Sequence, residues 1–522
     1  RYIWNATNRT HRLQHQIPQL LNLPSAIGYF LNDRSAAPHS LSSPDAYAAV
    51  CRSSYVHSRI PALLMAASPA DRPHAAQVKE TLSRHMLTKG MMPMVLDMDH
   101  SEGSRLRDAN TGTEYVDLFG FYASNPLGMN HPKLTNDADF MARLTDAAVN
   151  KVTNSDVMTQ HMARFVETFS RVGIPDYLPY TFFISGGALA VENALKAAFD
   201  WKVRKNYEKG YRREIGTEVL HLDQAFHGRS GYTLSLTNTA DPRKTMHFPT
   251  FDWPRIENPK VRFPLDGDEV ERVAQHEERA LQQAKRAFHE RKDRIACVIL
   301  EPIQGEGGDN HFRTSFLHRL KALAHENDAL LIFDEVQSGV GITGEFWAHQ
   351  SLGVQPDLIA FGKKTQVCGI LAGRKLDEVD DHVFQVPSRI NSTWGGNLVD
   401  MVRFDRILEV IEEDDLVAHA GTVGQHLQDR LQDLADDVPA VTNVRGRGLM
   451  CAFDLPSAEY RDAVKQHTFN EGAIVLGCGH RSIRFRSPLT ITERDIDDGV
   501  ACIRRALETV RREHGDGAMP EI

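Results

Sequence analysis

The sequence predicts an α/β fold in which a mostly parallel sheet is covered by helices on both faces. Beyond Phe140, segments that are apolar throughout alternate with longer segments of helical periodicity. Strands that are apolar on both sides must be buried on both faces, which is the arrangement of a parallel sheet between two layers of helices. From about Gly395 helices dominate, with a strand pair expected near 448–453 and 482–485. A smaller α+β domain, built from the C-terminal part and the N-terminal segment, is therefore also predicted.

The individual elements follow from the periodicity of the apolar residues. Val78, Leu82 and Met86 fall on one face of a helix, and short strands are expected at 94–98 and 115–118. Further strands are expected at 219–222, 296–300, 330–333 and 358–361, and helices at 188–204, 274–290 and 314–326.

These elements divide the chain into four expected parts. Residues 1–64 show no sustained helical or strand period, so we expect a disordered or non-native extension there. The segment 65–140 should pack with the small domain, which 395–522 should form. The range 141–394 should form the large domain, at whose strand ends a ligand is expected to bind.

The composition excludes several classes of protein. The 522 residues carry 60 Lys and Arg against 69 Asp and Glu, a formal net charge of −9. This acidic balance argues against nucleic acid as a partner, because phosphate binding needs a concentrated basic face. No apolar stretch is long enough for a membrane span. The six cysteines are scattered and form no C-x-x-C pair, so we expect reduced cysteines in a cytoplasmic protein, without a metal site.

Three chemically distinctive residues or turns follow predicted strands. Gly186, Gly187 and Ala188 lead from a strand into a helix, where free backbone N–H groups suit a phosphate, although such a pair of glycines is also typical of a plain tight turn. Asp334 ends a strand and needs a partner, which could be a helix cation, a metal or a pyridinium nitrogen. Lys363 follows another strand closely and could be solvated or form a Schiff base.

The neighbouring lysine and a glycine loop offer competing interpretations. Of the two adjacent lysines, Lys364 is the better candidate for a solvated side chain, because Lys363 lies nearer the strand end. The loop 339–344 satisfies the dinucleotide pattern G-x-G-x-x-G, which would indicate an NAD-dependent dehydrogenase. However, the mostly polar segment 334–338 separates it from the strand, and Asp357 precedes the next strand instead of ending it. A dehydrogenase therefore remains the poorer alternative.

Together, the three strand-end features fit pyridoxal 5′-phosphate. The phosphate would lie on the helix start at 187–188, the ring nitrogen on Asp334 and the aldehyde on Lys363. Each feature alone is a modest signal, whereas their combination in this order along the βα units is more specific.

Several sequence runs resemble a known family. The runs at 187–194, 301–306, 334–337 and 361–363 resemble the class III, fold type I ω-aminotransferases. Within that family the likeness is greatest to the lysine 6-aminotransferases, and it spans about residues 70–510. The longer runs that carry it are GGALAVENALKAAFDWK (186–202), AFHGRSGYTLSLTNT (225–239), FDWPRI (251–256), FGKKTQVCG (361–369), STWGGN (392–397) and RGRGLMCAF (445–453).

This resemblance implies a fold type I transferase that uses pyridoxal 5′-phosphate and forms a homodimer with the active site at the subunit interface. The implied reaction moves the ε-amino group of L-lysine to 2-oxoglutarate, giving L-glutamate and 2-aminoadipate 6-semialdehyde, which cyclises to piperideine-6-carboxylate. The alternative within the family is another amine donor, namely ornithine, 4-aminobutyrate or a diamine.

The resemblance also implies roles for individual residues around the cofactor. Lys363 would bond to the aldehyde and act as base and acid, and Asp334 would pair with the ring nitrogen. The remaining cofactor contacts would come from Gly187 and Ala188 (phosphate), Thr393 of the partner subunit (phosphate), Phe226 and His227 (ring) and Gln337 (3′ oxygen).

Four residues are implied to bind the substrates. Arg229 would hold the carboxylate distant from the reacting amine, and Gln337 would lie beside the substrate. Arg484 would bind the α-carboxylate of 2-oxoglutarate or glutamate, and Glu306 would mask Arg484 when lysine is bound. On the residues alone, Glu306 and Arg484 could equally form an ordinary surface ion pair.

Overall fold

The computed structural model describes residues 74–514, which belong to one compact unit. The extension expected at 1–64 lies outside the described residues. Among residues 74–514, no helix is long and apolar enough to cross a membrane.

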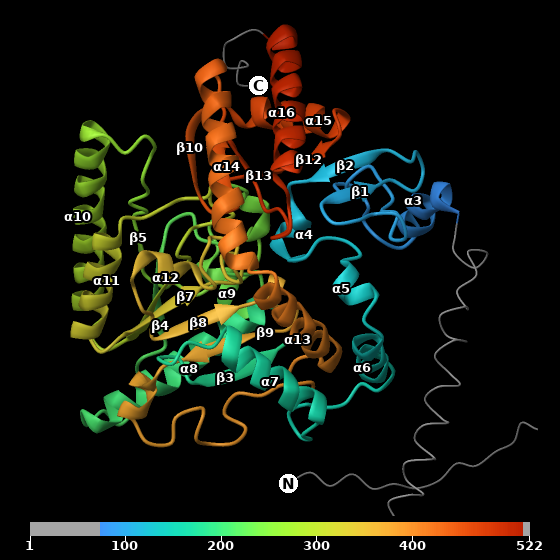
Figure 1. Cartoon of the computed structure of the whole chain (residues 1–522). Helices are drawn as coiled ribbons and strands as arrows, with labels where there is room; N and C mark the ends of the chain where they lie inside the picture. The colour runs from blue at the N-terminus through green and yellow to red at the C-terminus, as the bar shows by residue number, and fades with distance from the viewer. Residues whose placement is uncertain (1–73, 515–522) are drawn as a thin grey trace, which may run out of the picture. The chain divides into compact units, whose positions relative to one another are not determined.

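A seven-stranded sheet forms the centre of this unit (Figure 1). Its strand order is β3-β9-β8-β7-β6-β4-β5. The pairs from β8 through β5 are parallel, and β9 is antiparallel to both of its neighbours. The strands are β3 (Tyr180–Ile184), β4 (Glu218–Leu222), β5 (Arg255–Ile256), β6 (Ile295–Leu300), β7 (Leu330–Asp334), β8 (Leu358–Phe361) and β9 (Cys368–Ala372).

Helices cover both faces of the central sheet, as Figure 1 shows. Helix α8 packs along one face, whereas α11 lies on the other face with α10 against it. These helices and short turns are α7 (Gln160–Val172), α8 (Gly187–Glu208), α9 (Gly231–Leu236), η2 (Pro242–Lys244), α10 (Gly267–Glu290), α11 (Thr314–Glu326), α12 (Ala348–Leu352), η3 (Lys363–Thr365) and η4 (Arg374–Glu378).

The alternation of side chains along β7 explains why this strand is apolar throughout. Leu330 and Ile332 join the cluster under α8, and Leu331 and Phe333 join the larger cluster on the opposite face. All four side chains are fully or almost fully buried. Because successive residues of a strand point to opposite faces, a strand between two helical layers needs apolar residues at every position. The predicted mostly parallel sheet with helices on both faces is confirmed.

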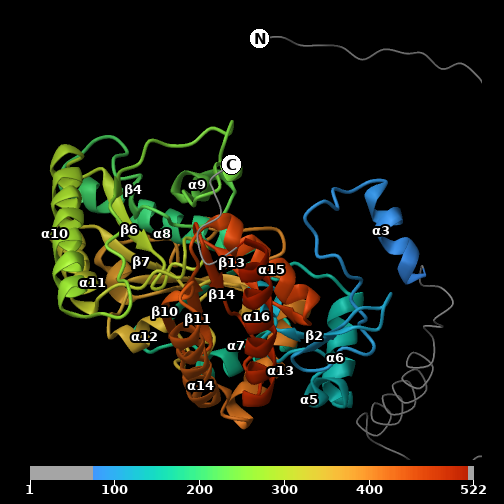
Figure 2. The same cartoon turned by 90° about the horizontal axis from the view of Figure 1, so that it is seen from above.

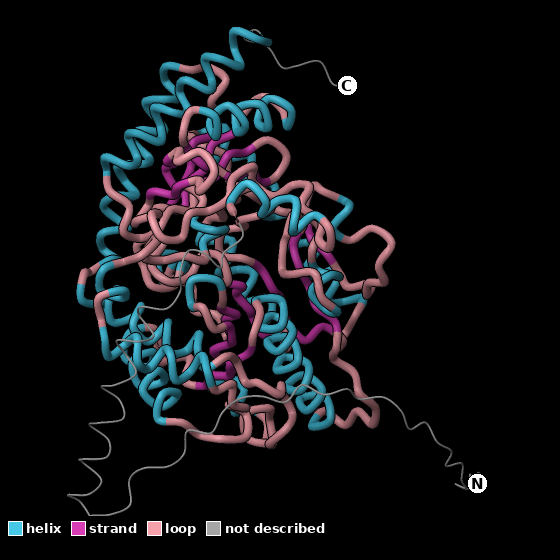
Figure 3. The backbone as a smooth tube through the Cα atoms, turned by 90° about the vertical axis from the view of Figure 1, so that its right-hand side faces the viewer, coloured by secondary structure: helices cyan, strands magenta, loops and turns pink. Residues whose placement is uncertain are grey.

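A second, antiparallel sheet lies in the C-terminal part, with order β10-β11-β14-β13. Figure 2 shows α14, α15 and α16 gathered around it, and Figure 3 shows its strands as a group separate from the central sheet. The elements are α13 (Leu398–Glu413), α14 (Leu416–Asp437), β10 (Thr442–Arg447), β11 (Met450–Asp454), α15 (Ala458–Asn470), β12 (Ala473–Ile474), β13 (Leu476–Cys478), β14 (Ser482–Arg484) and α16 (Glu493–His514).

The N-terminal segment joins this C-terminal part through a small three-stranded sheet. β2 pairs with β1 on one side and, in parallel, with β12 on the other. This pairing brings together residues more than 350 positions apart, such as Val116 and Ala473. The N-terminal elements are α3 (Ala75–Ser83), β1 (Arg105–Arg107), β2 (Glu114–Asp117), α4 (Gly120–Ala123), α5 (Pro132–Thr135) and α6 (Ala138–Val149).

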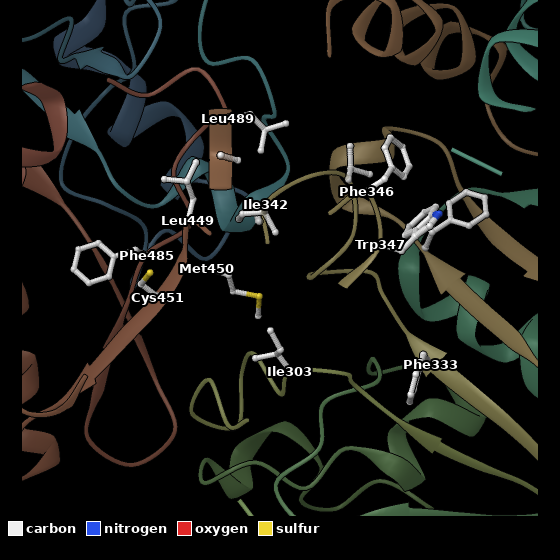
Figure 4. Close-up of a cluster of buried hydrophobic side chains, with 14 of the residues drawn as sticks. Ile303, Phe333, Ile342, Phe346, Trp347, Leu449, Met450, Cys451, Phe485 and Leu489 are labelled. Carbon is white, nitrogen blue, oxygen red and sulfur yellow. The ribbon is translucent and has the colours of Figure 1, made fainter. Parts of the chain in front are cut away.

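A continuous apolar cluster connects the large sheet to the C-terminal strands (Figure 4). Ile303 and Ile342, from loops after β6 and β7, pack with Leu449, Met450 and other buried residues around β11. Burial of this kind stabilises by about 25 cal/mol per Å² of apolar surface, so the cluster holds the strand-end loops of one sheet firmly against the other.

Most expected elements are confirmed to within a few residues, and three differ. The strand expected at 94–98 is reduced to a single bridge between Leu96 and Asp108. The backbone N–H of Val95 donates to the Asp108 carboxylate and is therefore not available for strand pairing. The helix expected through Met86 ends at Ser83. Helix α10 starts at Gly267, earlier than predicted, because Asp266 caps it.

Candidate active site

The carboxyl ends of three adjacent parallel strands carry the polar groups of the site. Glu301 directly follows β6, Asp334 ends β7, and Lys363 lies two residues after β8. The strand register pairs Leu300 with Phe333 and Asp334 with Ala360. Because neighbouring parallel strands end at the same edge, these groups are brought together; of the three, the sequence had indicated Asp334 and Lys363.

Asp334 is buried and fixed on both carboxylate oxygens. Its Oδ2 lies 2.8 Å from Nδ1 of His227, and its Oδ1 accepts the backbone N–H of Val336 at 3.1 Å. Nε2 of His227 is buried and has no hydrogen-bond partner among the described residues. Among residues 74–514, no group of three or more His, Cys, Asp or Glu side chains is arranged to hold a metal ion. Asp334 is therefore an oriented, buried carboxylate of the kind that can keep a proton on a ring nitrogen.

Glu301 is a second buried carboxyl group, which the sequence reasoning did not assign to the site. It accepts the backbone N–H groups of Phe226 and Gly305, each at 2.9 Å. Burial raises the pKa of Glu301 to about 7, and the negative charge of Asp334 adds to this effect. Its position at a strand end was the available signal, since the same rule had identified Asp334.

Lys363 has the environment of a reactive amine. Its backbone is in the left-handed region, with φ of +56°, which is unusual for a residue with a side chain and is typical of functional sites. Burial lowers the pKa of Lys363 to about 8, and the charges of Arg484 and Arg486 act in the same direction. A substantial fraction of the amine is therefore neutral near pH 7 to 8, the form that attacks an aldehyde.

The expectation that Lys364 is the solvated neighbour is wrong. Its side chain is buried, and its Nζ donates to the backbone oxygen of Gln337 at 2.9 Å. Burial and the adjacent Lys363 hold the pKa of Lys364 well below its ordinary value. The 3-10 turn η3 directs both lysines away from bulk solvent, which the pattern Lys-Lys does not reveal.

The start of α8 is a tight turn from β3 into the helix, where the sequence predicts a phosphate site. Gly186 has φ of +112°, and a Cβ on Gly187 would lie 2.9 Å from a methyl group of Val336. A Cβ on Gly362 would lie 3.3 Å from Val336 and 3.5 Å from Gly187 Cα. The helix start, the loop after Asp334 and the loop that carries Lys363 therefore pack together, and the first N–H groups of α8 are available for a phosphate.

Gln337 is held in one orientation by two arginines. Its Oε1 accepts from Nε of Arg486 at 2.9 Å and lies 3.3 Å from Nη1 of Arg484. Because arginine only donates, the amide oxygen must face the arginines and the amide nitrogen remains free to donate. Arg486 in turn forms an ion pair with Asp309 in which neither side chain is exposed.

Glu306 and Arg484 are in direct contact, 2.6 Å apart between Oε2 and Nη2. Arg484 is almost completely buried, so the alternative of an ordinary surface ion pair is wrong. Burial alone would raise the pKa of Glu306, but Arg484 and Lys244 hold it below its ordinary value. Glu306, Arg484 and Lys244 line a cavity of about 520 Å³.

Three other predicted residues lie at different degrees of exposure. Phe226 is partly exposed, with Nζ of Lys244 5.5 Å from its ring centroid. Thr393 is exposed. Arg229 is exposed as well. The residue before Arg229 is packed against the start of α8, where a Cβ on Gly228 would lie 2.6 Å from Cβ of Ala188, so the Arg229 segment borders the site.

The glycine loop 339–344 does not form a dinucleotide site. Gly341 and Gly344 have positive φ, but the next helix, α12, begins only at Ala348. The loop packs against the C-terminal part instead, where a Cβ on Gly448 would lie 2.5 Å from the backbone oxygen of Ile342. A phosphate would find no helix start here, so the dehydrogenase interpretation is wrong.

The fold and these groups define a class of protein. An anion-binding helix start, a buried carboxylate and an amine of lowered pKa at one sheet edge fit pyridoxal 5′-phosphate, and the fold is that of the fold type I enzymes that depend on this cofactor. Residues 86–507 match the model of the family described as aminotransferase class-III.

The similar proteins agree with this class. An L-lysine-epsilon aminotransferase of Mycobacterium tuberculosis is 56% identical over 435 residues, 83% of this chain and 96% of that protein. One of Amycolatopsis lactamdurans is 53% identical, with 83% and 96% covered. The solved structure of lysine aminotransferase from M. tuberculosis in the internal aldimine form has 55% identity and a TM-score of 0.82, covering 84% of this chain and all of that one. The chain belongs to the class III aminotransferases and is a pyridoxal-phosphate-dependent enzyme.

Proposed function

We propose that the protein is an L-lysine 6-transaminase, which transfers the ε-amino group of L-lysine to 2-oxoglutarate. The products are L-glutamate and 2-aminoadipate 6-semialdehyde, which cyclises to piperideine-6-carboxylate. The observation that carries this proposal is the masked arginine: Arg484 is buried in the site and neutralised by Glu306 at 2.6 Å. The names of the relatives that are 51 to 56% identical support the choice of lysine as donor.

The masked arginine suits an enzyme with two different substrates. Lysine presents its ε-amine to the reacting centre and carries no carboxylate next to that amine, so a free Arg484 beside it would be an unpaired charge. 2-Oxoglutarate carries a carboxylate next to its reacting carbon, and Arg484 can bind it through two parallel hydrogen bonds once Glu306 moves away. Arg229 binds the distant carboxylate of each substrate.

The cofactor and four residues divide the chemistry between them. Pyridoxal 5′-phosphate, when bound, supplies an aldehyde that bonds to amines and a ring that accepts the electron pair of a broken C–H bond. Nζ of Lys363 removes the proton from the ε-carbon of lysine and returns it to the cofactor side. Asp334, oriented by His227, holds a proton on the ring nitrogen, and the free amide nitrogen of Gln337 donates to the ring's 3′ oxygen.

The contacts at the phosphate and ring complete the site. The N–H groups at Gly187 and Ala188 would bind the phosphate at the start of α8, and Phe226 would pack against the ring. Glycine at position 187 lets the helix start approach the loop after Asp334, since a Cβ there would lie 2.9 Å from a methyl group of Val336.

We also propose a homodimer in which Thr393 binds the phosphate in the partner's site. Thr393 is exposed, and its backbone oxygen accepts from Oγ of Ser155 at 3.1 Å, which joins the two loops into one surface. That surface carries the exposed apolar side chains of Met158, at 98%, Val157, at 47%, and Trp394, at 40%. Large apolar side chains exposed on neighbouring loops are typical of a subunit interface. Light scattering of the purified holoenzyme should give twice the monomer mass, and a monomer with full activity would contradict the proposal.

Lysine labelled with nitrogen-15 only at the ε position tests the reaction directly. With 2-oxoglutarate present, mass spectrometry should find the label in the newly formed glutamate. Unlabelled new glutamate would mean transfer from the α-position, and the substrate orientation would then be wrong. No glutamate from protein that holds its cofactor would refute lysine as donor and leave ornithine, 4-aminobutyrate or a diamine to be tested.

A further inference from the structure

Glu306 is held by two cations, one on each carboxylate oxygen. Oε2 lies 2.6 Å from Nη2 of Arg484, and Oε1 lies 2.6 Å from Nζ of Lys244. Because the two contacts use different oxygens, the bond to Arg484 can break while the bond to Lys244 remains.

Lys244 is placed by its own loop and not by the catalytic groups. It ends the 3-10 turn η2, which begins at Pro242 and is capped by Asp241, whose side chain accepts the backbone N–H of Arg243 at 3.1 Å. Nζ of Lys244 also lies 3.2 Å from Oγ1 of Thr239. The ammonium group therefore lies at a fixed place beside Glu306 whether or not Arg484 is engaged.

The charges of the three residues make the second cation necessary. The side chain of Arg484 is 2% exposed, and those of Glu306 and Lys244 are 26% and 20% exposed. If Arg484 is released with Lys244 present, a Glu–Lys pair remains. If it is released without Lys244, a largely buried carboxylate loses every ionic partner, which is costly.

We propose that Lys244 is a specificity-determining positioning residue: it keeps Glu306 paired when Arg484 is given to the near carboxylate of a dicarboxylate acceptor. This inference rests on the proposed function, because it concerns the change from the donor to the acceptor. Without Lys244, Glu306 stays on Arg484 and the pocket remains set for the donor, which has no carboxylate beside its reacting amine.

Glutarate, a dicarboxylate without a reacting carbonyl, tests binding without catalysis. Calorimetric titration of the Lys244→Met holoenzyme should give a Kd about 5- to 30-fold higher than that of the wild type, as expected for a partly exposed charge contact. Lys244→Arg should restore the affinity to within about twofold. The matched control is Lys375→Met in the 3-10 turn η4, since Lys375 is similarly exposed, pairs with Glu378 and does not line this cavity; its Kd should not change.

Single-turnover kinetics separate the acceptor from the donor. Enzyme loaded with pyridoxamine 5′-phosphate and mixed with 2-oxoglutarate should lose about 5- to 30-fold in kcat/KM through KM in Lys244→Met, whereas the lysine half-reaction should stay within about twofold. In the double variant K244M/E306Q, glutarate should bind within about twofold of E306Q alone, because no carboxylate remains to lock Arg484.

Three outcomes would overturn the inference. The first is an unchanged glutarate Kd in Lys244→Met, and the second is an equal loss of kcat/KM in both half-reactions. The third is a glutarate affinity in the double variant well below that of E306Q, which would mean that Lys244 attracts the dicarboxylate directly. The acceptor measurements contain no lysine. If the wild type fails to use lysine but shows the expected pattern with 2-oxoglutarate and glutarate, the donor assignment fails and the role of Lys244 stands.

Discussion

Replacing Arg486 with methionine should lower the unfolding temperature of the holoenzyme by about 3–5 °C. Arg486 and Asp309 form an ion pair in which neither side chain has exposed surface. Nη1 of Arg486 donates to Oδ2 of Asp309 at 2.8 Å, and its Nε donates to Gln337 at 2.9 Å. Methionine fills much of the same space but leaves the Asp309 carboxylate buried without its cation.

The magnitude follows from the burial of the pair and the size of the unit. Breaking a fully buried pair by removing one partner costs about 3–5 kcal/mol. An unfolding entropy of about 2.1 cal/mol/K per residue gives about 0.9 kcal/mol/K for the roughly 440 described residues. Dividing the first quantity by the second gives the expected shift.

Differential scanning calorimetry at one scan rate and pH 7.5 measures this shift. The control is Arg430→Met, because Arg430 is half-exposed and pairs with the exposed Asp433, so its loss should change the unfolding temperature by less than about 1 °C. The double variant R486M/D309N should recover most of the loss, since asparagine is uncharged and tolerates the left-handed backbone of Asp309. An unchanged temperature in Arg486→Met, or additive losses in the double variant, would refute the reasoning.

Three further predictions concern the reacting groups themselves. Lys363→Ala should abolish transamination of every amine because Nζ moves the proton; more than about one-thousandth of the wild-type rate in a spectrophotometric half-reaction would contradict this role. The rate at which the apoprotein takes up pyridoxal 5′-phosphate should follow the neutral fraction of the Lys363 amine, whose pKa is lowered to about 8. The rate should therefore rise about tenfold per pH unit below pH 8 and level off above it. A rise that continues to pH 10 would contradict the lowered pKa. The folded-state pKa of Glu301 is about 7 and its ordinary value is 4.5, so protonation of Glu301 stabilises the apoprotein fully below pH 4.5, and this stabilisation is lost as pH rises through 7. Glu301→Gln should therefore flatten the pH dependence of the unfolding temperature between pH 5 and 8. Equal slopes for the wild type and the variant would exclude Glu301 as the source of that dependence.

The central sheet and its strand-end groups were accessible from the sequence because their signals are local. A strand buried on both faces needs apolar residues at consecutive positions, and β6, β7 and β8 show that pattern directly. The residue that follows such a strand lies at the ligand-binding edge, so Asp334 and Lys363 could be identified before any contact was known. The same rule, applied to Glu301, would have identified the third group.

The ion pairs of Glu306 could not be predicted from local patterns, and the pair with Arg484 was expected only from the family resemblance. Lys244 and Glu306 are 62 residues apart, and Glu306 and Arg484 are 178 apart. No local pattern states which of many charged residues will meet across such separations, because their meeting depends on how the second sheet packs against the loops of the first. The burial of Lys364 likewise depends on a distant residue, because its Nζ donates to the backbone oxygen of Gln337, 27 positions earlier in the chain.

The sequence by itself therefore determined the class of fold and the cofactor and predicted Lys363 as the reacting lysine, since burial along a strand and the chemistry at its end are read from consecutive residues. Only the tertiary structure decided that Arg484 is buried and neutralised, that Glu306 has a second cation in Lys244, and that Arg486 fixes Gln337. The physical reason is that the free energy of a charged group depends on its burial and on its partners, and both are properties of the packed molecule.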